Sequence, residues 1–401
     1  MMKVVIVDFG SKFNKFGGQA RIASVLYHDL KRYFTTYYIG YETGFLQSDP
    51  NTIMLSRGVL NPSLRKSKLS ELQLIRFGYN LTVARHMLGI DKKEILNKMK
   101  SIRPDAIIAN SIGDITLLKY LKYHGLHFKS IYIDHGSLST SIDGYLSKEG
   151  IPLTIGTGLY AYSTKHAIKQ FLNFFDMNIA LNGMQLKNIR TFTPKVEYIA
   201  NGLVIKTRKN AKRERELRKT YGLSAKNFVI LYIGRMFDRQ KNISTLIKAF
   251  LKTGEKNMRL LLIGEGPSLN DYKELAKNDR RIIFGVHVDN ETLNYVYDIV
   301  NLFVLPSHWE GLSLTILEAA AHSLPIILSN DIKIMGFDKR HKIITFKTDS
   351  PTDLYKKIEL VYKNRQARNS LVDTSKYIKR AFTKENMIAG YVKLIMDFAA
   401  S

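Results

Sequence analysis

The pattern of apolar and polar residues predicts an α/β protein. Short apolar runs alternate with longer stretches of helical pattern, as where VVIVDFG is followed by QARIASVLYHDLKRYF. Further strand-like runs are AIIAN and IYIDHG in the first half and FVILYIGR, RLLLIGEGP, RIIFGV, LFVLPS and PIILSN in the second. This rhythm is typical of βαβ units on parallel sheets with helices on both faces.

Two such domains are expected, because a chain of 401 residues is too long for one ordinary core. The run KVEYIANGL ends at Asn201-Gly202, and a very polar stretch follows. We therefore predict Rossmann-like, doubly wound domains over residues 1–201 and 202–384. A last helix, about residues 385–401, is expected to pack back on the N-terminal domain. The strand ends of both sheets would face one interdomain cleft, where such folds bind ligands.

The composition limits where the protein can be located and which reactions its side chains can perform. No apolar run approaches the ~20 residues that cross a bilayer, and MMKVVIVDFG is interpreted as a first strand rather than a signal peptide. The chain has no cysteine, which excludes disulfides and thiolate chemistry. We expect a cytoplasmic protein, either free or peripheral on the inner face of the membrane.

The chain is strongly basic, with 61 Lys and Arg against 35 Asp and Glu and a net charge of +26. This charge favours phosphates, nucleic acid or the cytoplasmic leaflet as partners. The basic run 208–219 is interpreted as a solvated helix face rather than a nucleic-acid arm. The segment PSLRKSKLSELQLIRF, residues 62–77, has an apolar helical face flanked by cations. This helix either packs on the sheet or lies on anionic lipid.

Two cations in the second half are placed to bind a diphosphate. FVILYI ends at Gly234-Arg235, and Lys241 directly precedes a helix expected from about Ile243. A helix N-terminus offers unpaired N–H groups, while Arg binds bidentately and Lys adds a point charge. The alternative is that both are ordinary surface cations.

Two glutamates follow in PSHWEGLSLTILEAAAHSLP. Glu310 and Glu318 lie eight positions apart, so on one helix that Glu310 begins, both would point to the same side. We expect these carboxylates to reach a sugar and a ribose, with the N–H groups of Leu312 and Ser313 aimed at phosphate oxygens. Alternatively, Glu310 only complements the helix dipole and Glu318 is an exposed helical carboxylate. The same loop contains Ser307, His308 and Gly311.

Two features of the first half could approach a ligand. Gly17-Gly18 open a helix after the first strand, and glycines allow a close backbone approach, although the pair can equally be a turn. His135 stands at the end of the strand IYIDHG, where Asp134 could orient it; a structural role is the alternative.

Together, IGRMFDRQKNISTLIKAF, RLLLIGEGP, RIIFGV, LFVLPSHWEGLSLTILEA and LPIILSN resemble family 4 of the retaining glycosyltransferases, also called glycosyl transferases group 1, with the GT-B fold. The resemblance covers nearly all of residues 228–330. It implies a retaining hexosyltransferase of EC class 2.4. The chain departs from the family at Ser323, where a glycine is usual.

The resemblance also implies roles for individual residues. Arg235 and Lys241 would neutralise the donor diphosphate, Glu318 would hold the ribose hydroxyls, and Glu310 would contact the sugar near the reacting carbon. His135 would contact the transferred sugar or the acceptor. Gly17 and Gly18 would lie near the phosphates, and the nucleobase would lie against Gly285, Val286 and His287. Catalytic roles are thus expected for Glu310, His135, Arg235 and Lys241.

The expected substrates follow from the same resemblance. The donor is a nucleotide diphosphate sugar, a UDP-sugar before a GDP-sugar, and no cofactor is expected. No Asp-x-Asp signature is present, so we expect no metal. The acceptor is expected to be a glycan, a glycolipid or another anionic molecule in cell-surface glycan or glycolipid synthesis. The sequence predicts no oligomeric state.

Other functions fit parts of the sequence. A non-enzymatic, basic nucleotide- or nucleic-acid-binding protein would explain the charge, but no recognition-helix, RNP or KH pattern supports a nucleic-acid partner. A phosphorylase of the same fold would bring a pyridoxal-binding lysine, for which we find no candidate. A catalytically dead homologue is disfavoured by the intact Arg, Lys and two Glu.

Overall fold

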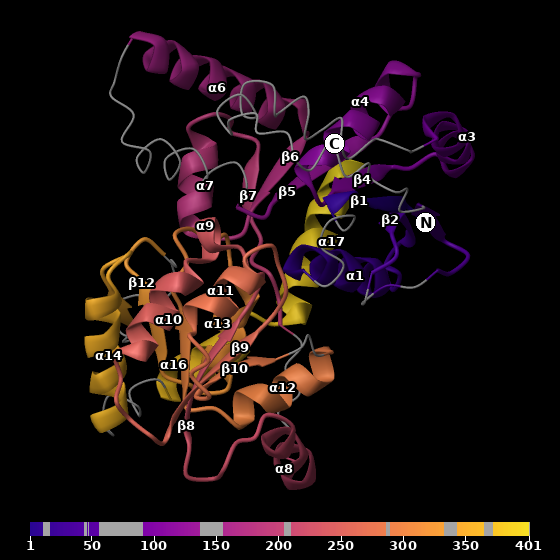
Figure 1. Cartoon of the computed structure of the whole chain (residues 1–401). Coiled ribbons are helices and arrows are strands. Elements are labelled where there is room, and N and C mark those ends of the chain that lie inside the picture. The colour runs from indigo at the N-terminus through magenta and orange to yellow at the C-terminus, as the bar shows by residue number, and fades with distance from the viewer. Residues whose placement is uncertain are drawn as a thin grey trace. The chain divides into compact units, whose positions relative to one another are not determined.

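The chain forms two units, each built on one parallel sheet (Figure 1). The computed structural model describes residues 1–10, 17–43, 46, 48–55, 91–136, 155–203, 210–285, 289–332, 343–364 and 372–400. Unit 1 comprises Met1–Ala200 with Met387–Ser401, and unit 2 comprises Asn201–Asn386. The amphipathic segment at 62–77, expected either to pack on the sheet or to lie on anionic lipid, lies outside the described residues. No helix in the described ranges is long and apolar enough to cross a bilayer.

Unit 1 has a seven-stranded sheet in the order β3-β2-β1-β4-β5-β6-β7, with every pair parallel. The strands are β1 Lys3–Asp8, β2 Thr35–Tyr41, β3 Thr52–Leu55, β4 Ala106–Ala109, β5 Lys129–Asp134, β6 Met177–Ala180 and β7 Val196–Tyr198. The helical segments are α1 Gly18–Leu30, α3 Lys92–Ile102, η3 Ile112–Asp114, α4 Ile115–Tyr123, α6 Ile155–Phe174, α7 Gly183–Arg190 and α17 Lys384–Ala400.

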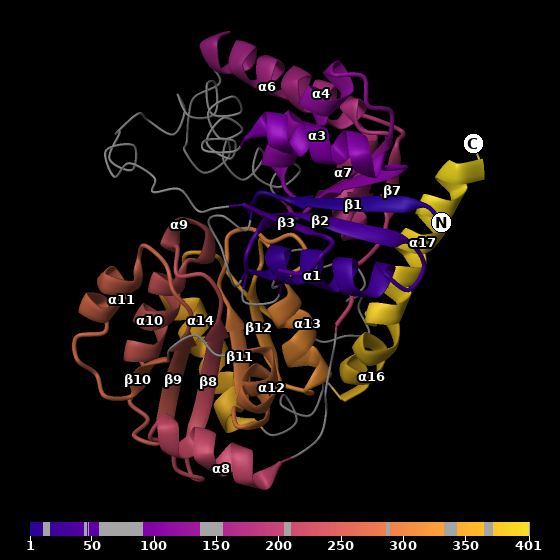
Figure 2. The same cartoon turned by 90° about the vertical axis from the view of Figure 1, so that its right-hand side faces the viewer.

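Both faces of this sheet are covered, which explains why its strands read as apolar runs rather than as alternating patterns. Val5 and Val7 of β1 belong to a buried cluster with side chains of α3, α4 and α6. Their neighbours Val4 and Ile6 are equally buried and face the other side. Figure 2 shows α1 against β1 and β2, with α3 and α4 across the sheet from it.

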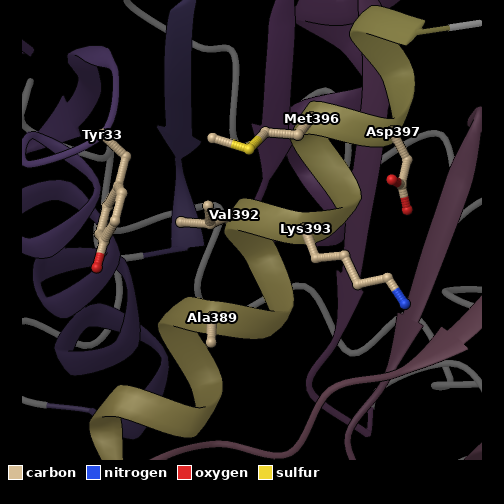
Figure 3. Close-up of a pocket in the computed structure, with 6 residues that line it drawn as sticks. All are labelled: Tyr33, Ala389, Val392, Lys393, Met396 and Asp397. Atoms are coloured by element: carbon tan, nitrogen blue, oxygen red, sulfur yellow. The ribbon is translucent and has the colours of Figure 1, made fainter.

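The C-terminal helix α17 returns to unit 1 and buries one face there. Its outer face and Tyr33 line a hollow of about 380 Å³, in which Val392 and Met396 point toward the tyrosine (Figure 3). Tyr33 lies two residues before the start of β2, so this hollow lies by the amino ends of the strands. Ligands of doubly wound folds bind at the opposite, carboxyl edge. The hollow is therefore not the expected donor site.

Unit 2 has a six-stranded parallel sheet in the order β10-β9-β8-β11-β12-β13. The strands are β8 Phe228–Ile233, β9 Met258–Ile263, β10 Ile282–Gly285, β11 Leu302–Leu305, β12 Ile326–Ser329 and β13 Ile344–Phe346. The helices are α8 Ala211–Thr220, α9 Asp238–Lys241, α10 Ile243–Leu251, α11 Leu269–Leu275, α12 Asn290–Asp298, α13 Leu314–Ala321, α14 Pro351–Lys363 and α16 Val372–Ala381. Helix α10 packs against α11 and α14, and α13 packs against α12 and α16.

Both sheets reverse their strand order at one internal point. In unit 1 the reversal lies between β1 and β4, and in unit 2 between β8 and β11. At such a switch point the loops after the two strands leave in opposite directions and open a crevice at the carboxyl edge. The two places at which the fold itself favours a ligand are therefore the loops after β1 and β4 and those after β8 and β11.

The C-terminus of α13 explains one departure from the family pattern. Ser323 N–H donates to Ala320 O at 2.9 Å, and Leu324 N–H donates to Ala319 O at 3.0 Å. These two bonds form a Schellman motif, in which Ser323 takes a left-handed conformation with φ of 60°. Glycine adopts this conformation without the crowding that a Cβ atom causes.

We predict that Ser323→Gly raises the free energy of unfolding of unit 2 by about 0.5 to 1 kcal/mol, because relief of left-handed strain exceeds the entropic cost of glycine. Trp309, the chain's single tryptophan, lies in unit 2, so its emission during urea titration follows this unit. Ser323→Ala is the matched control and keeps the strain. A Ser323→Gly variant no more stable than Ser323→Ala would contradict the prediction.

Candidate functional site

The switch point of the sheet in unit 2 holds a largely buried ion pair. Lys241 ends α9, which follows β8, and Glu310 lies in the loop after β11. Lys241 Nζ and Glu310 Oε1 are 2.6 Å apart, and the two side chains are only 14% and 8% exposed. Reduced contact with water strengthens the attraction between such charges. The pair places one cation and one carboxylate where the fold favours a ligand.

Hydrogen bonds to main-chain oxygens hold the two loops of this pair together. His308 N–H donates to Gln240 O at 2.8 Å, and Gln240 Nε2 donates to Trp309 O at 3.3 Å. Asn242 Nδ2 donates to Pro306 O at 3.2 Å. Asn242 itself takes a left-handed conformation with φ of 51°, which asparagine tolerates. The junction of α9 and α10 is thus fixed against the loop that carries Glu310.

Asp238 organises the start of α10, a role that the sequence interpretation missed. Its carboxylate accepts bonds from Ser244 N–H at 2.9 Å, Ser244 Oγ at 2.8 Å and the Tyr272 hydroxyl at 3.0 Å. These bonds supply the side-chain cap that Asn242, at the N-cap of α10, does not provide. The signal available in the sequence was an Asp at the first turn of a short helix.

The segment Gly264-Glu265-Gly266 packs closely against the loop after β8. A Cβ atom on Gly264 would lie 1.9 Å from Gly234 O, and one on Gly266 would lie 2.2 Å from Met236 O. Met236 N–H donates to Glu265 O at 2.8 Å. Side chains at either glycine would therefore push away the loop that follows β8.

Glu318 is buried within α13, with 5% of its surface exposed, and its Oε2 accepts a bond from the Tyr297 hydroxyl at 2.9 Å. It is therefore not the exposed helical carboxylate of the alternative interpretation. The expectation that Glu310 begins the same helix is wrong. Ser313, in an extended conformation, is the N-cap, and α13 begins at Leu314. The positions of the two glutamates are therefore not related by the geometry of one helix. Leu312 lies before the first turn of α13.

Other expected residues have different surroundings. Arg235 is exposed, with its guanidinium carbon 5.3 Å from the centre of the Phe237 ring. Ser307 is fully buried, and its hydroxyl has no hydrogen-bond partner among the described residues. His308 bonds Arg239 O and Asp349 Oδ1, each at 2.7 Å. Within the described chain, the geometry joins Lys241 to Glu310 but gives Arg235 no contact with either.

The expected nucleobase segment is described only in part. Gly285 ends β10, and a Cβ atom there would lie 3.0 Å from Ile263 Cγ1 and 3.1 Å from Tyr221 Cε1. Val286 and His287 lie outside the described residues. Their role stays a prediction.

In unit 1 the expected residues lie at the carboxyl edge of the sheet. Gly17 is the N-cap of α1, with φ of −73°, so this glycine is not required by a left-handed backbone. Gly18 begins the helix. His135 follows β5, and its Nε2 lies 2.9 Å from Oδ1 of Asn110, which follows β4. Burial lowers the pKa of His135 to about 4, so its imidazole is neutral at pH 7.

Comparison with known proteins identifies the segment that contains the ion pair. The profile of the family described as glycosyl transferases group 1 matches residues 213–378. This segment belongs to the glycosyl transferases group 1 family. The resemblance to glycosyl transferases group 1 is therefore confirmed for this segment, whereas family 4 and the retaining mechanism stay predictions.

The names of two curated relatives of this group 1 segment mention a lipid-linked sugar or a glycolipid. The UDP-Gal:alpha-D-GlcNAc-diphosphoundecaprenol alpha-1,3-galactosyltransferase of Escherichia coli is 31% identical over 36% of this chain. The alpha-monoglucosyldiacylglycerol synthase of Streptococcus pneumoniae is 31% identical over 41%. Each alignment spans 39% of the relative, so the chain matches less than half the length of either.

Solved structures extend the likeness from the group 1 segment to the whole chain. Sucrose-phosphate synthase from Thermosynechococcus elongatus has a TM-score of 0.73 at 17% identity, with 100% of both chains covered. HepE from Anabaena in complex with UDP-glucose has a TM-score of 0.72 at 13% identity, covering 99% of this chain and 100% of HepE. These identities establish the fold alone. The predicted α/β class and GT-B architecture of two Rossmann-like domains are confirmed.

We predict that Lys241 and Glu310 stabilise unit 2 cooperatively. Lys241→Met and Glu310→Gln should each lower the free energy of unfolding by about 1 to 3 kcal/mol, because each leaves a partly buried polar group unpaired. The double variant should lose less than the sum by about 1 to 2 kcal/mol. Urea titrations followed by Trp309 emission measure the cycle.

The matched control is the exposed pair Arg213 and Glu216, whose atoms are 3.3 Å apart and whose side chains are about half exposed. Its coupling should stay below about 0.5 kcal/mol. Strict additivity at Lys241 and Glu310 would show that the pair makes no net contribution.

Proposed function

We propose that this chain is a glycosyltransferase that moves a hexose from a nucleotide diphosphate sugar to a glycan or lipid-linked acceptor. The observation that carries the proposal is the pair of Lys241 and Glu310 at the switch point of a Rossmann-like sheet, inside the group 1 segment. A nucleotide-binding fold, a fixed cation and an adjacent carboxylate are the parts that donor binding requires.

The chemistry follows from where charge develops. When the bond between sugar and phosphate breaks, positive charge grows on the sugar and negative charge on the departing diphosphate. Lys241, which ends α9 directly before the N-cap of α10, stabilises the diphosphate by its charge in this proposal. Arg235 is exposed and free to approach the same phosphates. In this proposal Glu310 contacts the sugar near the reacting carbon.

Glu318 completes the donor contacts in this proposal. Its Oε2 accepts the Tyr297 hydroxyl, which holds the carboxylate in place, and in this proposal the same carboxylate binds the ribose hydroxyls. The nucleobase would lie by Gly285, and Gly17-Gly18 at the start of α1 would approach the phosphates. His135 would meet the transferred sugar or the acceptor.

UDP-sugars are the first candidates for the donor, because HepE holds UDP-glucose and the E. coli relative is named for UDP-Gal. Transfer with retention of anomeric configuration is part of the proposal, with the leaving phosphate assisting deprotonation of the acceptor. We also propose that the reaction needs no metal ion, with the charges of Arg235 and Lys241 taking the place of a divalent cation.

A lipid-linked or anionic acceptor suits the net charge of +26 and the names of the two relatives. A basic protein gains about 1 kcal/mol for each Lys or Arg that it brings to an anionic bilayer. We therefore propose a place in cell-surface glycan or glycolipid synthesis, with peripheral contact at the cytoplasmic face of the membrane.

The test begins with a thermal-shift screen of UDP, GDP and their hexose derivatives, followed by donor consumption without and with EDTA. One nucleotide class should stabilise the protein, and EDTA should leave consumption unchanged. Glu310→Gln should retain nucleotide binding but turn over about 100-fold more slowly, because an interaction that strengthens in the transition state is lost.

Glu216→Gln, at an exposed position of α8, is the matched control and should behave as wild type. Stabilisation by nucleotides with no sugar nucleotide consumed would contradict transferase activity and favour a non-enzymatic nucleotide-binding protein.

A further inference from the structure

A hydrogen-bonded network joins three elements at the switch point of the sheet in unit 1. Asn110, the fully buried residue after β4, donates its backbone N–H to Val7 O of β1 at 2.9 Å. Its side-chain Nδ2 donates to the main-chain oxygen of Gln19 in α1 at 3.1 Å. Gln19 Nε2 in turn donates to Asn110 O. Asn110 is thus bonded to both β1 and α1, in addition to its contact with His135.

These contacts determine which way the amide of Asn110 points. A main-chain oxygen only accepts hydrogen bonds, so the atom that faces Gln19 O must be the NH2 group. The amide oxygen Oδ1 therefore faces His135, and it lies 2.9 Å from Nε2. Because an amide oxygen only accepts, Nε2 of His135 must carry the hydrogen of this bond.

The protonation state of His135 then determines its other nitrogen. The ring keeps some solvent exposure, yet burial lowers its pKa to about 4, well below the ordinary 6.5. A neutral imidazole carries one N–H, and here that N–H is on Nε2. Nδ1 is consequently a bare acceptor, and it has no hydrogen-bond partner among the described residues.

We infer that Asn110 is a positioning residue that fixes His135 in the Nε2–H tautomer, so that Nδ1 accepts a hydrogen bond from a substrate hydroxyl. The tautomer follows from the hydrogen-bond network alone. The assignment of a substrate hydroxyl as the donor to Nδ1 rests on the proposed transferase function. With this tautomer, His135 accepts a hydrogen bond from a hydroxyl through Nδ1. It does not act as a cation that binds phosphate. A sugar or acceptor that lacks this hydroxyl would leave Nδ1 unpaired and bind more weakly.

The direct test is a long-range 1H–15N spectrum of the full chain labelled with 15N-histidine, with His135 assigned by its loss in His135→Gln. We expect a protonated Nε2 and an unprotonated Nδ1 that persist from pH 8 to pH 5. A proton on Nδ1, or an imidazolium at pH 7, would overturn the inference. The spectrum needs no substrate, so it decides the tautomer even if no sugar nucleotide is ever consumed.

Two variants test the role of Asn110 in turnover. Asn110→Leu removes the acceptor, so the spectrum should show mixed tautomers and kcat/KM should fall about 10-fold to 100-fold, as for other orienting partners of a functional histidine. Asn110→Asp supplies a carboxylate that raises the pKa of His135. The ring should then gain a second proton as the pH falls, and activity should be lost at a higher pH than in wild type.

The carboxyl groups of Asp8 and Asp134, which end β1 and β5, and of Asp114 in η3 are unchanged in both variants. They therefore provide the same electrostatic background for each comparison. A wild-type pH profile in Asn110→Asp, or a wild-type tautomer in Asn110→Leu, would show that Asn110 only packs.

Discussion

The ion pair of Lys241 and Glu310 is the interaction on which the functional account depends. Two opposite charges held 2.6 Å apart with little solvent contact are costly to desolvate, and they persist because each neutralises the other. The strand order of the sheet explains their position, because β8 and β11 are the adjacent strands whose loops diverge. Asp238, Asn242 and Gln240 then fix the loops so that the two charges meet.

The two units use their switch points in a parallel way. In unit 2 the loops after β8 and β11 meet through charged side chains, and in unit 1 the elements after β1 and β4 meet through the amides of Gln19 and Asn110. The first arrangement fixes a cation and a carboxylate, and the second fixes the proton of an imidazole. In the proposed reaction the arrangement in unit 2 stabilises the leaving group, and the arrangement in unit 1 orients a hydroxyl.

Strands with continuous apolar runs could be predicted from the sequence, because burial on both faces leaves an unambiguous pattern. Strand β2, with the sequence TTYYIGY, mixes polar and aromatic residues and begins just after the predicted helical stretch, so it was not predicted as a strand. The start of α13 was placed too early for a different reason. Helical spacing from Glu310 to Glu318 is compatible with a loop followed by a helix, and only backbone geometry distinguishes the two.

The chemical types of the site residues could be read from the sequence, but their partners could not. Lys241 and Glu310 are separated by 69 positions, and each was assigned to a different part of the donor rather than to the other. Asn110 and His135 are 25 positions apart, and their contact depends on the adjacency of β4 and β5. Contacts between such distant residues depend on the order of the strands in the sheet. Local sequence patterns predict the fold class but not which side chains meet.

Binding of a nucleotide's diphosphate by Lys241 can be measured by titrating UDP and GDP while following the emission of Trp309. This single tryptophan directly precedes Glu310, so its emission reports on the loop that carries the carboxylate. We expect saturable changes with one nucleotide and a Kd at least about 10-fold higher in Lys241→Met, because this variant loses a charge-assisted bond to the diphosphate. Equal affinity in Lys241→Met, or no response to either nucleotide in the folded protein, would contradict diphosphate binding by Lys241.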